Sequence, residues 1–550
     1  MKRLLIGAVS SLSLAAFSLQ ASAAHASNPS EYGSPQPFCS EQPFDCTELN
    51  QYVSGYTGHD EPSLLFYSNT PGSGNNQTYN LTLPSDPALQ GLQDVTNGTF
   101  NFELHPAFWF GMAMCDDQSA PNPGGSKLGP NVPCTPNSDA NIFNSSDPTS
   151  PNYMGLHPGT AFMEMQFYPP GWVAKPFGPS CSPTLWCAAL TIDSFSANQN
   201  TGQVLNPTCA ATTGIEYVNF AFITKNGVAQ APANPVDATL AQRTPDSNLD
   251  LFMRSGDNLS VAMADTPNGF QVQINDVTSG QSGSMTASAA NGFGEVQFAP
   301  TGTSCANIPT NFHPMYSTSS ESTRVPWAAH SYNIAFSDEL GHFEFCNDVN
   351  TDTLTCGGSS ATDPAGSDGD EFPCRQADAS LRIDISGCTG TDVDFDGPGY
   401  QNNWPGTIRD PNLDGQLHAT PIRFTSPVFN GGSNYDRVGF ETNLPRVEGS
   451  TNPPCQRFIS NPSDPNPGSG CVNPPVGASF YPFYSTTSIG GQCMWQLGGD
   501  FIPGTTNDFG GNSTAEYGSL LSLAYPGGHS QPTFRFNNFR NILQNNPCPA

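Results

Sequence analysis

The chain has 550 residues, with 17 Lys and Arg against 47 Asp and Glu, and its formal charge at neutral pH is −30. This balance disfavours nucleic acids and other polyanions as partners, because such ligands need a basic surface. Charged residues make up only 12% of the chain, so it is not a highly charged disordered protein either. The abundant Gly, Pro and Phe predict a loop-rich extracellular β protein with an aromatic core, compatible with an acidic environment.

Residues 1–26 have the three parts of a secretory signal peptide. Lys2 and Arg3 form a basic start, an apolar stretch runs from Leu4 to Leu19, and Ala21–Ala23 provides a small-residue cleavage site. Later segments do not approach the ~20 apolar residues of a membrane-spanning helix. We therefore expect a secreted, extracellular monomer without a membrane anchor.

The 16 cysteines all follow the signal peptide, and their even number predicts disulfides in an oxidising compartment. The spacings of Cys39 with Cys46 and of Cys181 with Cys187 suit short local loops, although spacing alone leaves the connectivity open. Zinc is disfavoured because the sequence has no pair of CxxC motifs.

Short apolar or alternating runs separated by turn residues predict an all-β protein. Residues 27–76 are rich in Pro, Ser and Gly and are expected to form an N-terminal arm. A β-sandwich domain is expected over 77–346, a Gly/Ser/Asp-rich linker over 347–373, and a second, smaller β-rich module over 374–550. The predicted strands lie in 78–83, 99–105, 107–114, 161–168, 185–195, 215–224, 250–288, 295–300, 331–340, 342–346, 380–386, 421–429 and 437–444.

An internal echo favours a duplicated submodule. Phe312 begins the run FHPMYSTSS, Phe480 begins FYPFYSTTS, and each Phe is followed 15 residues later by a Trp, Trp327 or Trp495. A shared pattern at a shared spacing is the sequence signature of a repeat.

The strand predicted at 161–168 carries the first candidate site. At a period of two, one face has Met163, Met165 and Phe167, and the opposite face has Phe162, Glu164, Gln166 and Tyr168. The Met/Phe face is expected to seal a core. The opposite face is expected to border an open groove with a carboxylate, an amide and a phenol, although an ordinary wet sheet face has the same pattern.

Glycoside hydrolysis needs two carboxyl groups, ~5–5.5 Å apart for retention or ~6.5–9.5 Å apart for inversion. Glu164 is the first candidate, paired with Glu344, which is preferred, or with Glu103. The predicted substrate-binding residues are Gln166, Tyr168, Trp172 and His342. The leading hypothesis is thus a secreted hydrolase acting on a polysaccharide or cell-surface glycan.

A second hypothesis is a non-catalytic glycan-binding protein that uses exposed aromatic residues, namely Trp172, Tyr316, Tyr484 and Trp495. No cofactor is required by either hypothesis. The run Asp392, Asp394, Asp396 and Gly397 matches the opening of a calcium loop, but the twelfth position is Asn403 where an EF-hand has Glu. It predicts either a structural Ca²⁺ site in a β loop or a polar turn.

The stretch from Ser255 to Phe298 has a Gly-Asp strand opener, an Asn-Asp-Val-Thr-Ser-Gly-Gln turn and a closing Phe-Gly-x-Val-x-Phe strand. It resembles part of the glutamic peptidases, acid proteases with a concanavalin-like β-sandwich. Their segment with the catalytic Glu is absent here, where the gap is only Ala289–Asn291. The resemblance implies a concanavalin-like jelly-roll sandwich, with an acid peptidase-like protein as a third functional alternative. The whole chain resembles a family of secreted microbial proteins that has no assigned activity.

Overall fold

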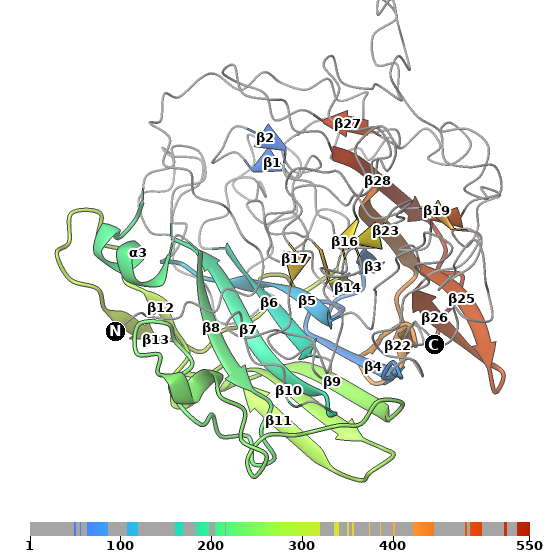
Figure 1. Cartoon of the computed structure of the whole chain (residues 1–550), viewed down its shortest axis with the longest axis horizontal. Helices are drawn as coiled ribbons and strands as arrows, with labels where there is room; N and C mark the ends of the chain where they lie inside the picture. Colours follow the sequence, from blue (N-terminus) through green and yellow to red (C-terminus); the bar gives the residue numbers. More distant parts are fainter. Residues whose placement is uncertain are drawn as a thin grey trace, which may run out of the picture.

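The structure is a computed structural model (Figure 1). It describes residues 63–85, 107–118, 160–168, 184–196, 204–214, 216–319, 335–339, 422–444, 484–497 and 536–550, with residue 182 and a few short strands elsewhere. In these ranges almost every element is a β-strand, and the strands pair in antiparallel fashion. The prediction of a mostly β, disulfide-containing protein is confirmed.

Sheet I has nine strands. They are β4 (Asn76–Thr82), β9 (Asn258–Thr266), β10 (Gly269–Asp276), β11 (Ser282–Thr286), β20 (Arg423–Phe424), β21 (Val428–Phe429), β22 (Ser433–Asn434), β25 (Tyr484–Ile489) and β26 (Gln492–Leu497). Their order is β11-β10-β9-β4-β20-β26-β25, with β21 and β22 beside this path.

Sheet II also has nine strands. They are β3 (Ser63–Tyr67), β5 (Ala107–Cys115), β6 (Thr160–Tyr168), β7 (Cys187–Phe195), β8 (Glu216–Phe222), β14 (Ala335–Glu339), β23 (Arg437–Leu444), β27 (Ser522–Ala524) and β28 (Phe536–Leu543). Their order is β27-β28-β23-β3-β14-β5-β6-β7-β8.

The remaining elements are short. Two-stranded pairs join β1 (Leu49–Asn50) to β2 (Gly55–Tyr56), β12 (Gly294–Val296) to β13 (Asn307–Pro309), β15 (Val349–Asn350) to β16 (Thr355–Cys356), β17 (Pro373–Cys374) to β18 (Ile385–Ser386), and β19 (Tyr400–Gln401) to β24 (Ser479–Phe480). The described helices are α3 (Pro207–Thr213) and the 3₁₀ turns η5 (Leu240–Arg243) and η6 (Ala289–Asn291). None of the described helices is long and apolar enough to span a membrane.

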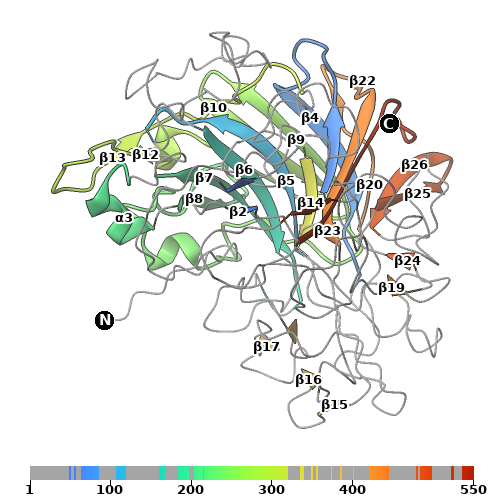
Figure 2. The same cartoon turned by 90° about the horizontal axis from the view of Figure 1, so that it is seen from above.

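The two sheets pack face to face over one hydrophobic core, as Figure 2 shows from above. Aromatic rings cross between the sheets: Phe336 of β14 stacks on Phe424 of β20 with ring centres 3.9 Å apart, and Tyr79 of β4 lies 4.4 Å from Phe110 of β5. Pairs of this kind add about 0.5–1.5 kcal/mol beyond the burial of their area. Phe side chains, which are abundant in the sequence, therefore fill much of the core between the two sheets.

Two buried tyrosines in this core differ in their hydrogen bonding. The Tyr435 hydroxyl donates to the Ser73 carbonyl oxygen at 2.6 Å, whereas the Tyr79 hydroxyl has no partner among the described residues. Burial raises the pKa of both phenols well above the ordinary value, so both remain neutral. Since an unpaired buried hydroxyl costs about 1–3 kcal/mol, Tyr79 is a built-in cost to stability.

The substitutions Tyr79→Phe and Tyr435→Phe are therefore expected to act in opposite directions. Tyr79→Phe should raise the free energy of unfolding by about 1 kcal/mol, because it removes an unpaired hydroxyl and keeps the ring. Tyr435→Phe should lower it by about 1 kcal/mol, because it strands the Ser73 carbonyl. Urea unfolding of both variants measures the sign of each change in the free energy of unfolding. Equal changes would contradict the different hydrogen bonding of the two hydroxyls.

Strands from both predicted modules share both sheets. β20 lies between β4 and β26 in sheet I, and β23 pairs with β3 in sheet II. β3 lies within the range expected to be an N-terminal arm, yet it occupies the middle of sheet II. The predicted boundary therefore does not separate two sheets, and the predicted linker, apart from short strands, lies outside the described residues.

The two copies of the internal echo occupy non-equivalent positions. In the first, Ser319 bridges to Ser68 and Pro314 bridges to Met114, at the ends of sheet II strands. In the second, residues 484–497 form the β25–β26 hairpin at the edge of sheet I. The arrangement thus differs from that of a duplicated submodule, and Trp327 lies outside the described residues.

Two disulfides fasten segments that are distant in sequence. Cys209 of α3 joins Cys305, and Cys493 of β26 joins Cys548. Cys115 and Cys187 are also disulfide-bonded, and none of the cysteines in the described part is free. The local loops predicted for Cys39 with Cys46 and for Cys181 involve residues outside the described ranges.

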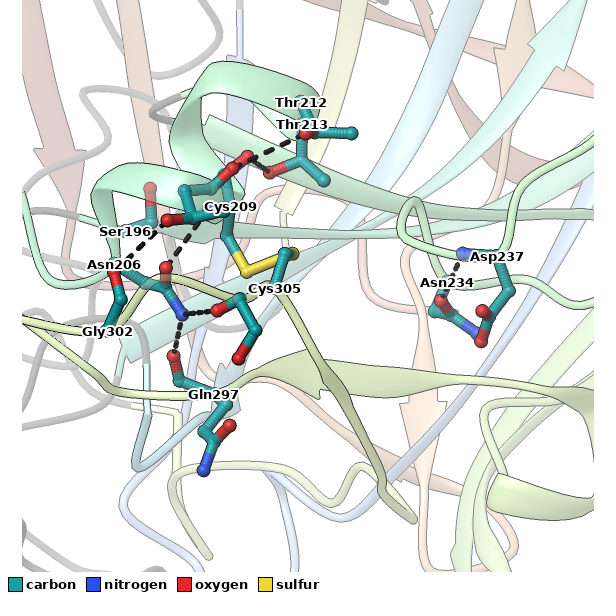
Figure 3. Close-up of a disulfide and its surroundings, with 12 residues drawn as sticks. Ser196, Asn206, Cys209, Thr212, Thr213, Asn234, Asp237, Gln297, Gly302 and Cys305 are labelled. Atoms are coloured by element: carbon teal, nitrogen blue, oxygen red, sulfur yellow. Dashed lines mark hydrogen bonds between the residues drawn. A yellow bond between two sulfur atoms is a disulfide. The ribbon is translucent and has the colours of Figure 1, made fainter.

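Helix α3 is anchored at its start by a single amide (Figure 3). Asn206 accepts a hydrogen bond from the Cys209 amide nitrogen at 3.0 Å and donates through Nδ2 to the Gln297 carbonyl oxygen at 2.8 Å. Pro207 occupies the first helical position, where its missing N–H costs nothing. An Asn-Pro pair before a helix is a recognised start signal, which the strand-based prediction passed over.

Candidate functional site

The alternation predicted for β6 is confirmed, but its second face is not open. Met163, Met165 and Phe167 lie in the core between the sheets. On the opposite face Glu164 is 6% exposed and Gln166 is 3% exposed. The expectation that this face borders an open groove is therefore wrong for these two residues.

A second hydrophobic layer buries this outer face of sheet II. Met315 and Tyr316 pack there against Phe162 of β6 and Ala113 of β5. They are held by a backbone hydrogen bond of 2.9 Å from the Met315 nitrogen to the Ala113 oxygen. A Cβ added at Gly111, the residue paired with Glu164, would lie 2.3 Å from the Trp109 ring, so this indole lies over the neighbouring strand position.

The polar groups on this face bond to one another. Tyr168 donates from its hydroxyl to Gln166 Oε1, and Gln166 donates through Nε2 to the Glu164 carboxylate. On β7, Thr191 Oγ1 lies 3.0 Å from the Glu164 carbonyl oxygen and 3.2 Å from Asp193 Oδ2. Buried polar groups need such partners, so these bonds give Glu164 and Gln166 a structural role.

The other members of the predicted catalytic and metal sites lie outside the described residues. They are Glu103, Glu344, Trp172, His342, Asp392, Asp394 and Asp396. Within the described ranges no group of three or more His, Cys, Asp or Glu side chains is placed to hold a metal ion.

The aromatic residues proposed as an exposed glycan platform are buried where they are described. Tyr316 and Trp495 are 0% exposed, and Tyr484 is 1% exposed. Trp495 packs near Phe440 of the opposite sheet, and Tyr484 lies in the same core. These three rings are therefore part of the packing and cannot stack on a ligand.

A cluster of carboxyl groups lies beyond the end of β5. Glu295 of β12 is 5% exposed and faces Asp116 and Asp117. Burial raises the pKa of Glu295 well above its ordinary value, and the two aspartates and a hydrogen bond with the Asp117 side chain add to the rise. The Tyr217 hydroxyl donates to Asp116. Glu295 therefore retains a proton at a pH where an exposed Glu has lost it.

A second carboxyl pair organises the predicted 275–281 turn. Asp276 Oδ1 accepts hydrogen bonds from the backbone nitrogens of Thr278 and Ser279, each at 2.9 Å. Asp257 lies against Asp276. Burial, followed by the charge of Asp276, raises the pKa of Asp257, and the Arg254 backbone N–H opposes the rise. This pair fixes a turn and presents no site for a substrate.

An accessible polar surface lies on the outer face of sheet I, and the sequence reasoning did not single it out. Residues paired across four adjacent strands point to the same side. We call the resulting twelve residues the polar grid: Asn76, Ala264, Gln271 and Thr286; Thr78, Ala262, Gln273 and Ser284; Asn80, Ser260, Asn275 and Ser282. Their side chains are exposed or half-buried, and between them lie the buried residues of the core face.

The polar grid has five carboxamides and five hydroxyls but no charged or aromatic side chain. Few of its groups are tied to each other: Gln271 Nε2 lies 3.2 Å from Thr286 Oγ1, and Gln273 Nε2 lies 3.4 Å from Asn275 Oδ1. Asn76 is fixed by Asn430, whose backbone nitrogen donates to Asn76 Oδ1 at 2.7 Å. Donors and acceptors therefore remain available to a ligand. The period-two pattern of residues 258–286 contains the signal for this surface.

No family model, curated protein or solved structure matches the chain.

The chemistry of the two surfaces differs accordingly. The carboxylate of Glu164 is buried and hydrogen-bonded to Gln166, so its role is structural. The polar grid instead offers an accessible array of neutral side chains, ten of which carry carboxamide or hydroxyl groups that donate and accept hydrogen bonds. Such an array can bind a polar, uncharged partner without desolvating any ion of its own.

Proposed function

We propose that the protein is a secreted, non-catalytic binding protein for neutral glycans, and that it binds them on the polar grid of sheet I. The observation that carries the proposal is the accessible array of carboxamides and hydroxyls without a single charge on four adjacent strands. Sugar hydroxyls both donate and accept, as carboxamides do, so the two surfaces are complementary.

Other partner classes fit this surface less well. Nucleic acids need Lys and Arg, and the protein carries a formal charge of −30. Protein interfaces concentrate their binding energy in Trp, Tyr and Arg, none of which lies in the polar grid. A neutral, hydroxyl-rich ligand is what remains.

The glycan-binding alternative takes precedence over the hydrolase because Glu164, the first catalytic candidate, is 6% exposed and bonded to Gln166. A general acid or nucleophile has to reach its substrate. The proposed binding mode uses amides where the sequence predicted aromatic platforms, because Tyr316, Tyr484 and Trp495 are buried.

Two further points belong to the same proposal. Export is supported by the signal-like start of the sequence and by the disulfides Cys209–Cys305 and Cys493–Cys548, which form in oxidising compartments. A concanavalin-like jelly roll is supported by two antiparallel sheets over one core and by the resemblance of residues 255–298.

A pull-down on insoluble neutral and anionic polysaccharides tests the function. The wild type should bind neutral polysaccharides, and raising the salt from about 50 to about 500 mM should leave the bound fraction unchanged, because no ion pair is involved. The double variant Gln271→Glu and Gln273→Glu should lose binding, since a bound sugar would desolvate two charges. Gln492→Glu, at an exposed position of β26 in the same sheet, is the matched control. A wild type that binds no neutral polysaccharide would refute the function.

A further inference from the structure

We infer that the ligand is a single extended chain of a neutral polysaccharide that lies along β9, between the side chains of β4 and β10. The inference rests on the proposed function and specifies how the polar grid is used. It also identifies the residues that would contact the chain from each side.

The inference follows from the three rows of the polar grid. The β4 row has Asn76, Thr78 and Asn80, and the β10 row has Gln271, Gln273 and Asn275. Between them the β9 row has only Ala264, Ala262 and Ser260. Longer side chains, of which all but Thr78 bear an amide, thus flank a row of short ones on both sides.

The dimensions of a sheet set the size of this feature. Adjacent strands are ~4.8 Å apart, so the two flanking rows are separated by about 10 Å at their Cα atoms. This separation admits one chain of sugar rings between the rows but not two. Hydroxyl groups on both edges of such a chain meet carboxamides of β4 and of β10 at the same time.

The length of the row is also defined. β9 extends from Asn258 to Thr266, and its short outward residues from Ser260 to Ala264 span about 13 Å at ~3.3 Å per residue. Beyond one end of the row lies Asn258, whose Oδ1 accepts a hydrogen bond of 2.8 Å from Thr82 Oγ1 of β4. At the other end the β9–β10 turn follows, where Thr266 Oγ1 lies 2.6 Å from the Gly269 oxygen.

The charge of the surface selects the class of sugar. Neither flanking row carries a Lys or Arg that could pair with a uronate, sulfate or phosphate. A net charge of −30 further repels anionic chains. The ligands that fit this surface are therefore unmodified hexose or pentose polymers without bulky branches.

The test compares two single substitutions to tryptophan in the full-length protein. Ala262→Trp fills the middle of the β9 row, whereas Gln492→Trp adds the same group at an exposed position of β26, outside the polar grid. Binding is measured by calorimetry with a length series of linear gluco-, manno- and xylo-oligosaccharides. Ala262→Trp should weaken binding at least tenfold and Gln492→Trp less than twofold. Affinity for the wild type should rise with oligosaccharide length and level off once the ligand exceeds the row's length of about 13 Å.

A second pair of variants keeps the inference testable if Ala262→Trp does not fold, which near-ultraviolet circular dichroism would reveal. Gln273→Ala should weaken binding about tenfold through the loss of one or two hydrogen bonds. Gln492→Ala should leave it unchanged. If the wild type binds a neutral oligosaccharide but Ala262→Trp and Gln273→Ala bind it equally well, the placement along β9 is overturned while the function stands. Equal weakening by Gln492→Trp also overturns the placement, and absence of any wild-type binding overturns the function itself.

Discussion

Replacing both Cys493 and Cys548 with serine is expected to lower the free energy of unfolding by about 4 kcal/mol. The disulfide joins residues 55 apart, and a crosslink closing a loop of that size removes about this much free energy from the unfolded chain in the chain-entropy model. Cys548 is itself 0% exposed and packs in the core between the sheets, so its loss also loosens that packing.

The effect of this change extends to a network around Ser426. Trp495 Nε1 donates to Ser426 Oγ at 2.8 Å, Asn546 Nδ2 donates to it at 3.1 Å, and Ser426 Oγ lies 2.6 Å from the Cys548 carbonyl oxygen. When Cys548 is released, Ser426 Oγ loses its acceptor, and the hydrogen bonds that it accepts from Trp495 and Asn546 are weakened with it.

Urea unfolding followed by tryptophan fluorescence measures the outcome. Asn546→Ala, with the disulfide intact, is the companion variant and should cost about 1–2 kcal/mol through the lost side-chain bonds. A double cysteine variant with the same midpoint as the wild type would contradict the role given to this crosslink.

Stability is expected to rise as the pH falls from 8 to about 4.5, which is the second large effect. Asp250 is 0% exposed and its pKa is raised to about 6, mainly by burial, with the Asp246 charge adding to the rise and the Asp246 backbone N–H and Lys225 opposing it. The folded state therefore holds a proton that the unfolded chain releases near its ordinary value of 3.8. Its contribution is full below that value and is lost as the pH rises through about 6.

The size of the effect follows from the shift. A rise from 3.8 to about 6 corresponds to about 3 kcal/mol for Asp250 alone. Glu295 and Asp257 act in the same direction, because their pKa values are also raised. The raised pKa values of these three carboxyl groups therefore all favour the folded state at low pH.

Thermal unfolding at several pH values tests this prediction. Asp250→Asn mimics the protonated side chain and should match the wild type near pH 4, yet exceed its stability at pH 8. Asp436→Asn, with a side chain 64% exposed, is the control and should leave the pH profile unchanged. A wild type that loses stability steadily between pH 7 and pH 4.5 would refute the acid adaptation.

The sequence predicted the strands far better than their environment. Local alternation identified β6 and the β9–β11 meander, and it correctly assigned Met163 and Met165 to the core. The same alternation says nothing about what lies on the far side of a sheet. Met315 and Tyr316, which are distant in sequence, pack against Phe162 and Ala113 on the face that contains Glu164.

Similar reasoning explains the other differences. Trp495 and Tyr484 have the polar neighbours of exposed residues, but β20 and the opposite sheet enclose them. The predicted N-terminal arm includes β3, because the short apolar run of β3 follows a Pro- and Ser-rich stretch. Its place in the sheet depends on pairing with β14 and β23, which are remote in the sequence. Part of the polar grid could have been predicted from the sequence, because residues 258–286 alternate regularly. Its extension to Asn76 and Asn80 depends on the register of β4 against β9, which the sequence does not show.

The position of β3 has a consequence for how the protein is made. Residues 63–67 find their neighbours in β14 and in β23, which begins at Arg437, so the middle of sheet II cannot close until most of the chain has left the ribosome. Contacts between such remote segments make folding slow. The middle of sheet II therefore stays incomplete during most of the synthesis of the chain, and it closes only after Arg437 and the residues that follow have emerged.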